Sequence, residues 1–528
     1  MGLSVLAGPA NAGKVALLLD RYVETLDHDP VLVVPNGAEV ERIERDLLAR
    51  HPALLGGSVG TFDDLFTHIA RDAGGSARPL IGASERQLLL SRVVASAPLD
   101  GLAGSARFGG FLHSLGAAVA EAEGALLEPA DLGGRLGDLY GRYRAELDRL
   151  GVWDHELERR YAADLVARDL GAWDGRPVFA YGFEDLTGAQ WALLEALAAR
   201  SDVLVSLPYE PGRSVFASLA RTAADVLALA DGRVEELPAQ PSYEAPALAH
   251  LERTLFGGGP AASAAPSPPL GGAIRFFEGA GPRAALELVA EEVLALVREG
   301  VPAERIALVC PNVERFRAPL TTAFGSLGVP YVIEGAVPLV RTPLGRALLG
   351  LLRFAWLGAP RRQLFAFLRS PFSSLPRARV DFVEGRLRGR AITEPERVET
   401  ESAALLGRPL PHVGALRAAG DDLAAVRDLA AAMLRAAYGL GNPPESDEAA
   451  LDLRAHDAVR GVTAELDEWL ARGEALSRDD LVHALEAAPV RSGRAGQPGR
   501  IAVLDLLRAR TRRFDAVFVL GLEEGSFP

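Results

Sequence analysis

The sequence contains almost no cysteine and almost no lysine. Cys310 is the single cysteine among 528 residues. One thiol excludes disulfides, four-cysteine zinc sites and cysteine-held iron–sulfur clusters within this chain. Cys310 ends the apolar run 306–309, so we expect it to be a small buried residue. Of the 56 lysine and arginine residues, only Lys14 is a lysine. A bias toward arginine explains this rarity, but not the position of the one lysine that remains.

Long apolar segments and excess positive charge are also missing. Arg353 interrupts the best apolar candidate, 347–357, whereas a membrane-spanning helix needs about 18 to 20 apolar residues. Residues 1–7 lack the basic start of a signal peptide. We therefore expect a cytoplasmic protein without a membrane partner. Because the net charge is −14, attraction to nucleic acid would need local basic patches.

The remaining composition is that of a multidomain globular protein. The chain is 49% apolar and 24% charged, which excludes a disordered or fibrous protein. At about 150 residues per domain, the length predicts roughly three or four folded units. The histidines are scattered without metal-ligand spacing. We therefore predict neither a metal centre nor a catalytic group made of a nucleophile and a base.

Short apolar runs alternate with long helical stretches in both halves of the chain. The β-like runs lie at 3–7, 31–34, 178–181, 203–207, 274–277, 306–309, 501–504 and 516–520. Apolar strands separated by helices are typical of parallel sheets covered on both faces. The sequence thus predicts an α/β fold with two parallel-sheet cores, each carrying a mostly α-helical insertion.

Composition also predicts the domain boundaries. The tract 256–272 is rich in glycine, alanine, serine and proline, and we expect it to be a linker. The first core is predicted at 1–75 plus 173–255, with a helical insertion at 76–172. The second core is predicted at 273–341 plus 491–528, with an insertion at 342–490. Since residue 528 comes just after its last strand, this second core looks truncated.

Lys14 lies in a candidate phosphate loop. Residues 8–15 read Gly-Pro-Ala-Asn-Ala-Gly-Lys-Val and follow the strand 3–7. The order strand, Gly-x-x-x-x-Gly-Lys and helix is that of a P-loop, in which backbone N–H groups and the lysine bind phosphates. The position of the sole lysine predicts that Gly8, Gly13 and Lys14 bind a nucleotide such as ATP.

This loop is incomplete, because Val15 occupies the position where serine or threonine would ligate Mg²⁺. Valine offers no oxygen to a metal. Two interpretations remain open: the loop binds phosphate without placing a metal, or it is a relic that binds nothing.

The segment 178–190 extends the pattern. It contains an apolar strand that ends in Tyr181 and Gly182, then Phe183, Asp185 and Gln190. The order of segments resembles superfamily 1 helicase cores of the UvrD/RecB type, and more closely the inactivated helicase region of AddB-type subunits of bacterial ATP-dependent helicase–nucleases. In active relatives, acids at the positions of Tyr181 and Gly182 hold Mg²⁺ and polarise the attacking water. The resemblance implies two RecA-like cores, with Gln190 at the nucleotide, ATP bound without hydrolysis and Mg²⁺ not held by this chain alone.

The resemblance also implies contacts to DNA. Asn36 follows the strand 31–34, and Thr61 lies in a Gly-Thr-Phe segment; in the family both places contact the DNA backbone. Residues 500–528 are similar to the family's fifth motif, which implies that Arg508 and Arg510 contact DNA. Helix capping is the alternative for Asn36 and Thr61, and pairing with carboxylates is the alternative for the arginines.

A second basic cluster is formed by Arg386, Arg388 and Arg390. Guanidinium groups bind phosphates and stack on bases. In an acidic chain, however, most arginines pair with surface carboxylates. We therefore leave the role of this cluster open.

The resemblance implies a function without catalysis by this chain. AddB-type proteins grip unwound DNA beside an AddA-type motor subunit, and they continue into a nuclease domain with an iron–sulfur cluster that residues 1–528 do not contain. We expect a heterodimeric, DNA-binding and catalytically degenerate subunit that acts on single- and double-stranded DNA in double-strand-break processing and recombinational repair. Two alternatives remain: an active DNA-dependent ATPase or helicase with non-standard metal ligands such as Glu184 and Asp185, and a truncated fragment without function.

Overall fold

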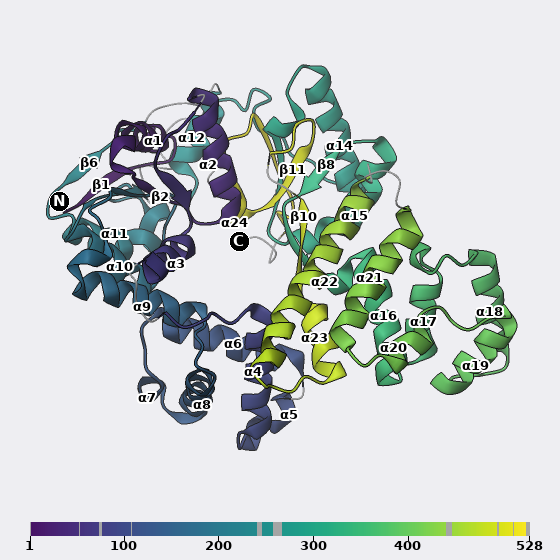
Figure 1. Cartoon of the computed structure of the whole chain (residues 1–528). Helices are drawn as coiled ribbons and strands as arrows, with labels where there is room; N and C mark the ends of the chain where they lie inside the picture. Colours follow the sequence, from purple (N-terminus) through teal and green to yellow (C-terminus); the bar gives the residue numbers. More distant parts are fainter. Residues whose placement is uncertain are drawn as a thin grey trace.

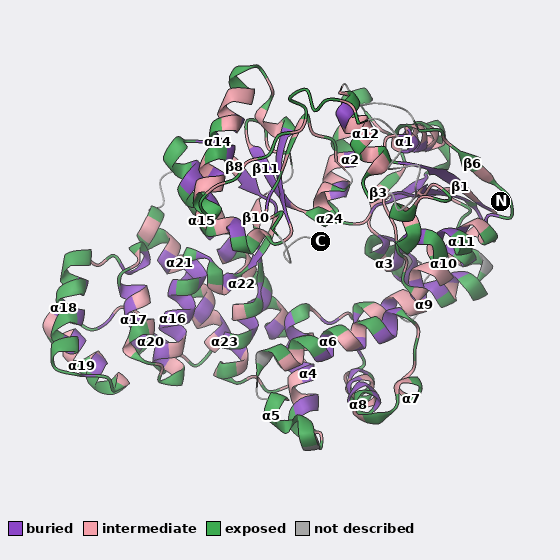
Figure 2. Ribbon diagram, turned by 180° about the vertical axis from the view of Figure 1, so that it is seen from behind, coloured by how far each residue is buried: buried purple, intermediate pink, exposed green. Residues whose placement is uncertain are grey.

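The computed structural model describes residues 2–51, 53–72, 77–106, 108–239, 245–256, 267–439, 446–493, 496–510 and 512–523. Two parallel β-sheets lie beside one another, each with its own helices. Most of the helices that do not cover a sheet form a layer below the two sheets in the view of Figure 1. Buried residues concentrate in the strands and along the inner sides of the helices (Figure 2). Within these ranges, no helix has both the length and the apolar character that crossing a membrane requires.

The first sheet has six described strands in the order β3-β2-β4-β5-β1-β6, and every pair is parallel. The strands are β1 (Gly2–Gly8), β2 (Val31–Val33), β3 (Ser58–Gly60), β4 (Val178–Ala180), β5 (Asp202–Pro208) and β6 (Val234–Glu236). In parallel sheets the carboxyl ends of the strands share one edge. The loops after β1, β2, β3 and β4 therefore start at the same edge of this sheet.

Helices cover both faces of the first sheet. Side chains alternate along a strand, so Val5 and Leu6 point to opposite faces. The Val5 face is covered by α3 (Phe62–Asp72), α9 (His155–Arg168), α10 (Gly188–Ala198) and α11 (Ala220–Leu229). The Leu6 face is covered by α1 (Lys14–Glu24) and α2 (Gly37–Arg50). The short helix α12 (Pro246–Thr254) follows this core in the chain.

The second sheet has the described order β12-β7-β11-β8 and is also parallel. Its strands are β7 (Ile306–Cys310), β8 (Tyr331–Ile333), β11 (Ile501–Asp505) and β12 (Ala516–Val519). One face packs on α14 (Pro282–Arg298) and α15 (Val313–Leu327), and the other carries a smaller cluster with Ala509 of α24 (Leu506–Ala509) and Phe514. Cys310 is buried in this sheet, as predicted, and burial raises its pKa to about 11.

The helices outside the sheets come from two stretches of chain. The first stretch follows α3 and contains α4 (Ala83–Ser96), α5 (Ala103–Ala106), α6 (Gly109–Gly124), α7 (Pro129–Leu132) and α8 (Gly134–Leu150). The second lies between β9 (Gly335–Pro338) and β10 (Pro489–Gly493), which pair antiparallel. It contains α16 (Pro343–Leu357), α17 (Arg361–Leu368), α18 (Arg377–Gly389), α19 (Pro395–Leu406), α20 (Val413–Ala418), α21 (Asp422–Tyr438), α22 (Asp447–Ala471) and α23 (Arg478–Ala487).

These two groups of helices share one hydrophobic core. Leu89 and Leu139 of the first group lie in the same buried cluster as Leu348 and Trp469 of the second. Helix α4 packs against α22 and α23. Ion pairs at the rim of this core join Arg472 to Glu85, and Arg149 to Glu474 at 2.9 Å. The two insertions are therefore one packed body.

A cluster of buried polar side chains lies inside the first insertion. Glu123 of α6 and Asp154 at the start of α9 are both almost fully buried. The Tyr143 hydroxyl donates to Asp154 Oδ2 at 2.6 Å, and an Arg144 nitrogen lies 3.7 Å from Glu123 Oε1. Burial first, and then the charge of Asp154, raise the pKa of Glu123 to about 9. Burial and the neighbouring carboxylate therefore favour the protonated form of Glu123.

The structure confirms the predicted fold class, an α/β fold with two parallel-sheet cores and helical insertions. The predicted strand at 274–277 is wrong, because this stretch is irregular and Phe276 is 82% exposed. No described strand of the second sheet pairs with it. Of the predicted linker, residues 257–266 lie outside the described residues. The boundaries between cores and insertions remain predictions.

Candidate nucleotide and DNA sites

The candidate phosphate loop connects β1 to α1, as the sequence predicts. Gly8 ends the strand, and Gly13 has a φ of 86°, in the left-handed region that favours glycine. At Gly8 a Cβ would lie 2.7 Å from the backbone oxygen of Leu237, so a side chain does not fit there. Helix α1 then begins at Lys14, which places the positive end of the helix dipole at the loop.

Lys14 is buried beneath this loop. Its Nζ donates to the backbone oxygen of Gly8 at 2.8 Å and to that of Pro9, and the side chain is 8% exposed. Burial lowers its pKa from 10.5 to about 8. An ammonium group has three donors, and the described residues accept two of them. One donor of the Lys14 ammonium group therefore has no acceptor among the described residues.

Val15, Tyr181 and Gly182, which stand where oxygen groups would hold a metal and its water, offer no carboxylate. The Val15 side chain packs into the apolar cluster of α1 and α2. Tyr181 is buried directly after β4, and its N–H donates to the backbone oxygen of Val33 at 3.0 Å. Glu184 pairs with Arg510 at 2.7 Å. Asp185, beside Glu184, is exposed, and its Oδ1 accepts from the Leu186 N–H at 2.9 Å. Whether these two carboxylates can replace the missing metal ligands remains a prediction. No cluster of three metal-ligating side chains occurs in the described part of the chain.

Gln190 is used in a helix cap. Its Oε1 accepts from the Thr187 N–H at 2.9 Å, while the Thr187 hydroxyl accepts from the Gln190 N–H at 3.3 Å. This reciprocal pair is a capping box at the start of α10. The structure thus gives Gln190 a local role, and its predicted contact with a nucleotide remains a prediction.

Asn36 and Thr61 also begin helices. Asn36 Oδ1 accepts from the N–H groups of Ala38 and Glu39, each at 3.1 Å, at the start of α2. The Thr61 hydroxyl accepts from the Asp64 N–H at 3.3 Å and donates to Asp64 Oδ2 at 2.8 Å, at the start of α3. Both residues have the capping role that is the alternative to DNA contact. They lie at the same edge of the first sheet as the candidate phosphate loop.

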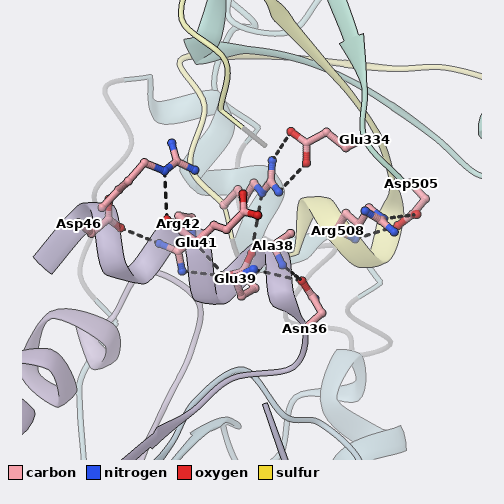
Figure 3. Close-up of polar contacts among 11 residues, drawn as sticks. Asn36, Ala38, Glu39, Glu41, Arg42, Asp46, Glu334, Asp505 and Arg508 are labelled. Carbon is pink, nitrogen blue, oxygen red and sulfur yellow. Dashed lines mark hydrogen bonds and ion pairs between the residues drawn. The ribbon is translucent and has the colours of Figure 1, made fainter. Parts of the chain in front are cut away.

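The two predicted DNA-contacting arginines are paired with carboxylates. Arg508 Nε lies 3.1 Å from Asp505 Oδ2, within α24 and its cap. Arg510 bridges the two cores: it donates to the backbone oxygen of Gly182 at 3.2 Å and pairs with Glu184. Figure 3 shows Arg508 facing Asp505 near the start of α2. Contact with DNA would require a phosphate to compete with these carboxylates.

A buried ion network that sequence reasoning missed lies beside these arginines. Arg512 of the second core donates to Glu334 Oε1 at 2.7 Å, and its Nε lies 3.8 Å from Glu39 Oε1 of α2. Glu39 in turn accepts from Arg42 at 2.8 Å. The side chains of Arg512 and Glu334 are 8% and 2% exposed. Figure 3 shows Glu39 and Glu334 extending toward one another from the two cores. The network therefore links the first core to the second.

The chain is similar to B subunits of bacterial ATP-dependent helicase/deoxyribonucleases. No family model matches it. The B subunit of the ATP-dependent helicase/deoxyribonuclease of Desulforudis audaxviator is 26% identical over 622 aligned residues, which cover 100% of this chain and 53% of that protein. The same subunit of Moorella thermoacetica is 30% identical, over 82% of this chain and 41% of that protein. The predicted AddB-type resemblance is confirmed.

The alignments cover only part of each relative. The corresponding subunit of Pelotomaculum thermopropionicum is 26% identical over 100% of this chain and 52% of that protein. The chain thus spans about half the length of the curated relatives it matches. The relatives are about twice as long as this chain. The activities and partners that their names state are therefore proposals for this chain.

Proposed function

We propose that this chain is the catalytically degenerate, helicase-like part of an AddB-type subunit in a helicase–nuclease complex. In this proposal it binds single- and double-stranded DNA during double-strand-break processing and recombinational repair in the cytoplasm. An AddA-type partner supplies the motor. The observation that carries the proposal is the loss of three side chains in an AddB-like chain: Val15 and Tyr181 replace metal ligands, and Gly182 replaces the acid that would polarise the attacking water.

The nucleotide part of the proposal rests on the 8–14 loop. Gly8 and Gly13 allow the loop to approach a phosphate closely, and Lys14 supplies the charge. A bound ATP would contribute its phosphates as a ligand that stabilises the first core. Hydrolysis would require a positioned metal and an activated water, and Val15, Tyr181 and Gly182 offer side chains for neither.

Lys14 allows a chemical test of nucleotide binding, because the chain has no other lysine. An amine-reactive acetylating reagent should modify Lys14 with an apparent pKa of about 8, since burial lowers its pKa. We expect ATP to protect Lys14, as measured by mass spectrometry of the peptide that contains it. The amino-terminal amine of the same molecule is the internal control. An unchanged rate of Lys14 acetylation at saturating ATP would contradict nucleotide binding.

The affinity for ATP should also depend on pH. A phosphate favours the charged form of Lys14 and so raises its pKa. Affinity is therefore expected to be highest below about pH 8 and to fall as the pH rises through the lowered pKa of Lys14. Fluorescent-nucleotide binding between about pH 6.5 and 9.5 would measure this, with Lys14→Ala as the variant expected to lose the dependence.

Phosphate release separates this proposal from the enzyme alternative. We expect no steady-state release above background when single-stranded DNA is added, because Glu184 is paired with Arg510. Release that Lys14→Ala abolishes would establish an active ATPase and overturn the degenerate assignment. Co-purification with an AddA-type subunit tests the partner separately.

A further inference from the structure

The second insertion ends in a positively charged tip. Helices α18 and α19 form one end of the molecule, away from both sheets (Figure 1). Residues 361–408 contain ten arginines and six carboxylates, although the whole chain carries a net charge of −14. A local excess of positive charge on an acidic protein is the electrostatic pattern expected at a surface for a polyanion.

The charges on α18 are divided between its two exposed flanks. Val380, Val383 and Leu387 are buried and hold the helix against its neighbours. On one flank the arginines are neutralised: Arg388 lies 3.2 Å from Glu384 Oε1, and Asp381 Oδ1 lies 2.9 Å from Arg369 Nε. This flank is an ordinary surface of ion pairs.

The other flank has an exposed aromatic ring among arginines. Phe382 is 57% exposed, and the Arg386 guanidinium lies 5.9 Å from its ring centroid. Arg386 is exposed and has no carboxylate within ion-pair distance among the described residues. Arg379 donates to the backbone oxygen of Leu406 at 2.6 Å, which is a neutral acceptor, and no carboxylate in the described part of the chain pairs with it. We call Arg379, Phe382 and Arg386 the α18 flank.

The neighbouring carboxylates are mostly occupied elsewhere. Glu401 pairs with Arg390 at 3.1 Å, and Glu399 pairs with Arg417. Glu394 and Glu396 lie at the start of α19, whereas Arg379 reaches the last turn of that helix. Arg408, just beyond this turn, is exposed and has no carboxylate partner in the described part of the chain. The Arg379 end of the flank therefore keeps its positive charge.

We propose that the α18 flank is a docking surface for single-stranded DNA, with a base stacked on Phe382 and phosphates on Arg379 and Arg386. Charge complementarity selects a polyanion. The exposed ring selects single strands, since their bases are free to stack on an aromatic face while those of a duplex are stacked on each other. This inference deepens the proposed function by naming a DNA contact outside both cores.

The test is the binding of a fluorescein-labelled oligothymidylate to the full chain, followed by fluorescence anisotropy. Phe382→Ala is expected to weaken binding about five-fold or more, as for other aromatic stacking platforms. Arg386→Ala should weaken binding and reduce the salt dependence by about 0.7 in the slope of log K against log salt. Arg388→Ala on the opposite flank is the matched control, and it should change the affinity less than about two-fold, because its charge is already paired.

Further outcomes separate this inference from the proposed function. Phe382→Trp should bind DNA normally, and its emission should be quenched by the oligonucleotide. DNA binding by the full chain that neither Phe382→Ala nor Arg386→Ala changes would overturn the α18 flank and leave the proposed function standing. No DNA binding at low salt would contradict both. Equal loss of duplex binding in Phe382→Ala, or tighter binding of polyglutamate than of DNA at this flank, would overturn the assignment to single strands.

Discussion

Replacing Arg512 with methionine is expected to destabilise the chain by about 3–5 kcal/mol, the usual cost of leaving a buried charge without its partner. Glu334 is 2% exposed and has Arg512 as its charged partner. Glu39 keeps Arg42 in the variant, at 2.8 Å. The variant therefore leaves Glu334 without its charged partner. The decrease in stability is the cost of protonating this carboxylate or of exposing it to water. Thermal unfolding followed by circular dichroism would measure the decrease.

Two control variants make this prediction specific. Arg508→Met removes a half-exposed pair with Asp505 on a nearby element, and we expect a change of less than about 1 kcal/mol. The double variant Arg512→Met with Glu334→Met removes both buried charges, and it should recover most of the loss. Equal destabilisation by Arg512→Met and Arg508→Met would show that the buried network does not join the cores.

Glu123→Gln is expected to stabilise the chain at alkaline pH. The folded-state pKa of Glu123 is about 9 against an ordinary 4.5. The folded state therefore binds a proton that the unfolded state releases. The stability from this group is fully present below about pH 4.5 and is lost progressively as the pH rises to about 9, by roughly 1.4 kcal/mol for each pH unit at most. Glutamine cannot ionise and removes this dependence.

The measurement is the unfolding temperature of both proteins between about pH 5 and pH 9. The wild-type chain should lose stability across this range, and Glu123→Gln should lose much less. Other groups facing Glu123 are Asp154, Arg86, Arg144 and Tyr140. Glu121→Gln on the exposed face of the same helix is the matched control, with no expected effect. Parallel pH curves for the wild type and Glu123→Gln would refute a protonated Glu123.

The parts of the fold that depend on local pattern can be predicted from the sequence. The buried strands β1, β2, β7 and β11 are largely apolar, so their composition alone indicates them. The edge strand β6 escapes such a prediction, because two of its three residues are glutamates. Residues 274–277 have the composition of a strand but no pairing partner among the described strands. Apolar composition predicts burial, whereas pairing depends on distant segments.

The same distinction applies to the candidate site. The phosphate loop is contiguous, so the spacing of Gly8, Gly13 and Lys14 reveals it. The network of Arg512, Glu334 and Glu39 joins residues that are far apart in the chain, and nothing in the sequence marks them as partners. The nearest sequence prediction concerns Arg508 and Arg510, which the resemblance assigns to DNA, and it does not extend to Arg512.

The shared core of the two insertions has a mechanical consequence. The two sheets are connected once through Arg512 and Arg510, and a second time through the helices packed between α4 and α22. A pair of lobes joined at one point can swing like a hinge. Lobes joined at two separated points form a closed frame, in which any rotation strains the opposite side. We therefore expect the two lobes of this chain to keep a fixed arrangement rather than to open and close about one hinge.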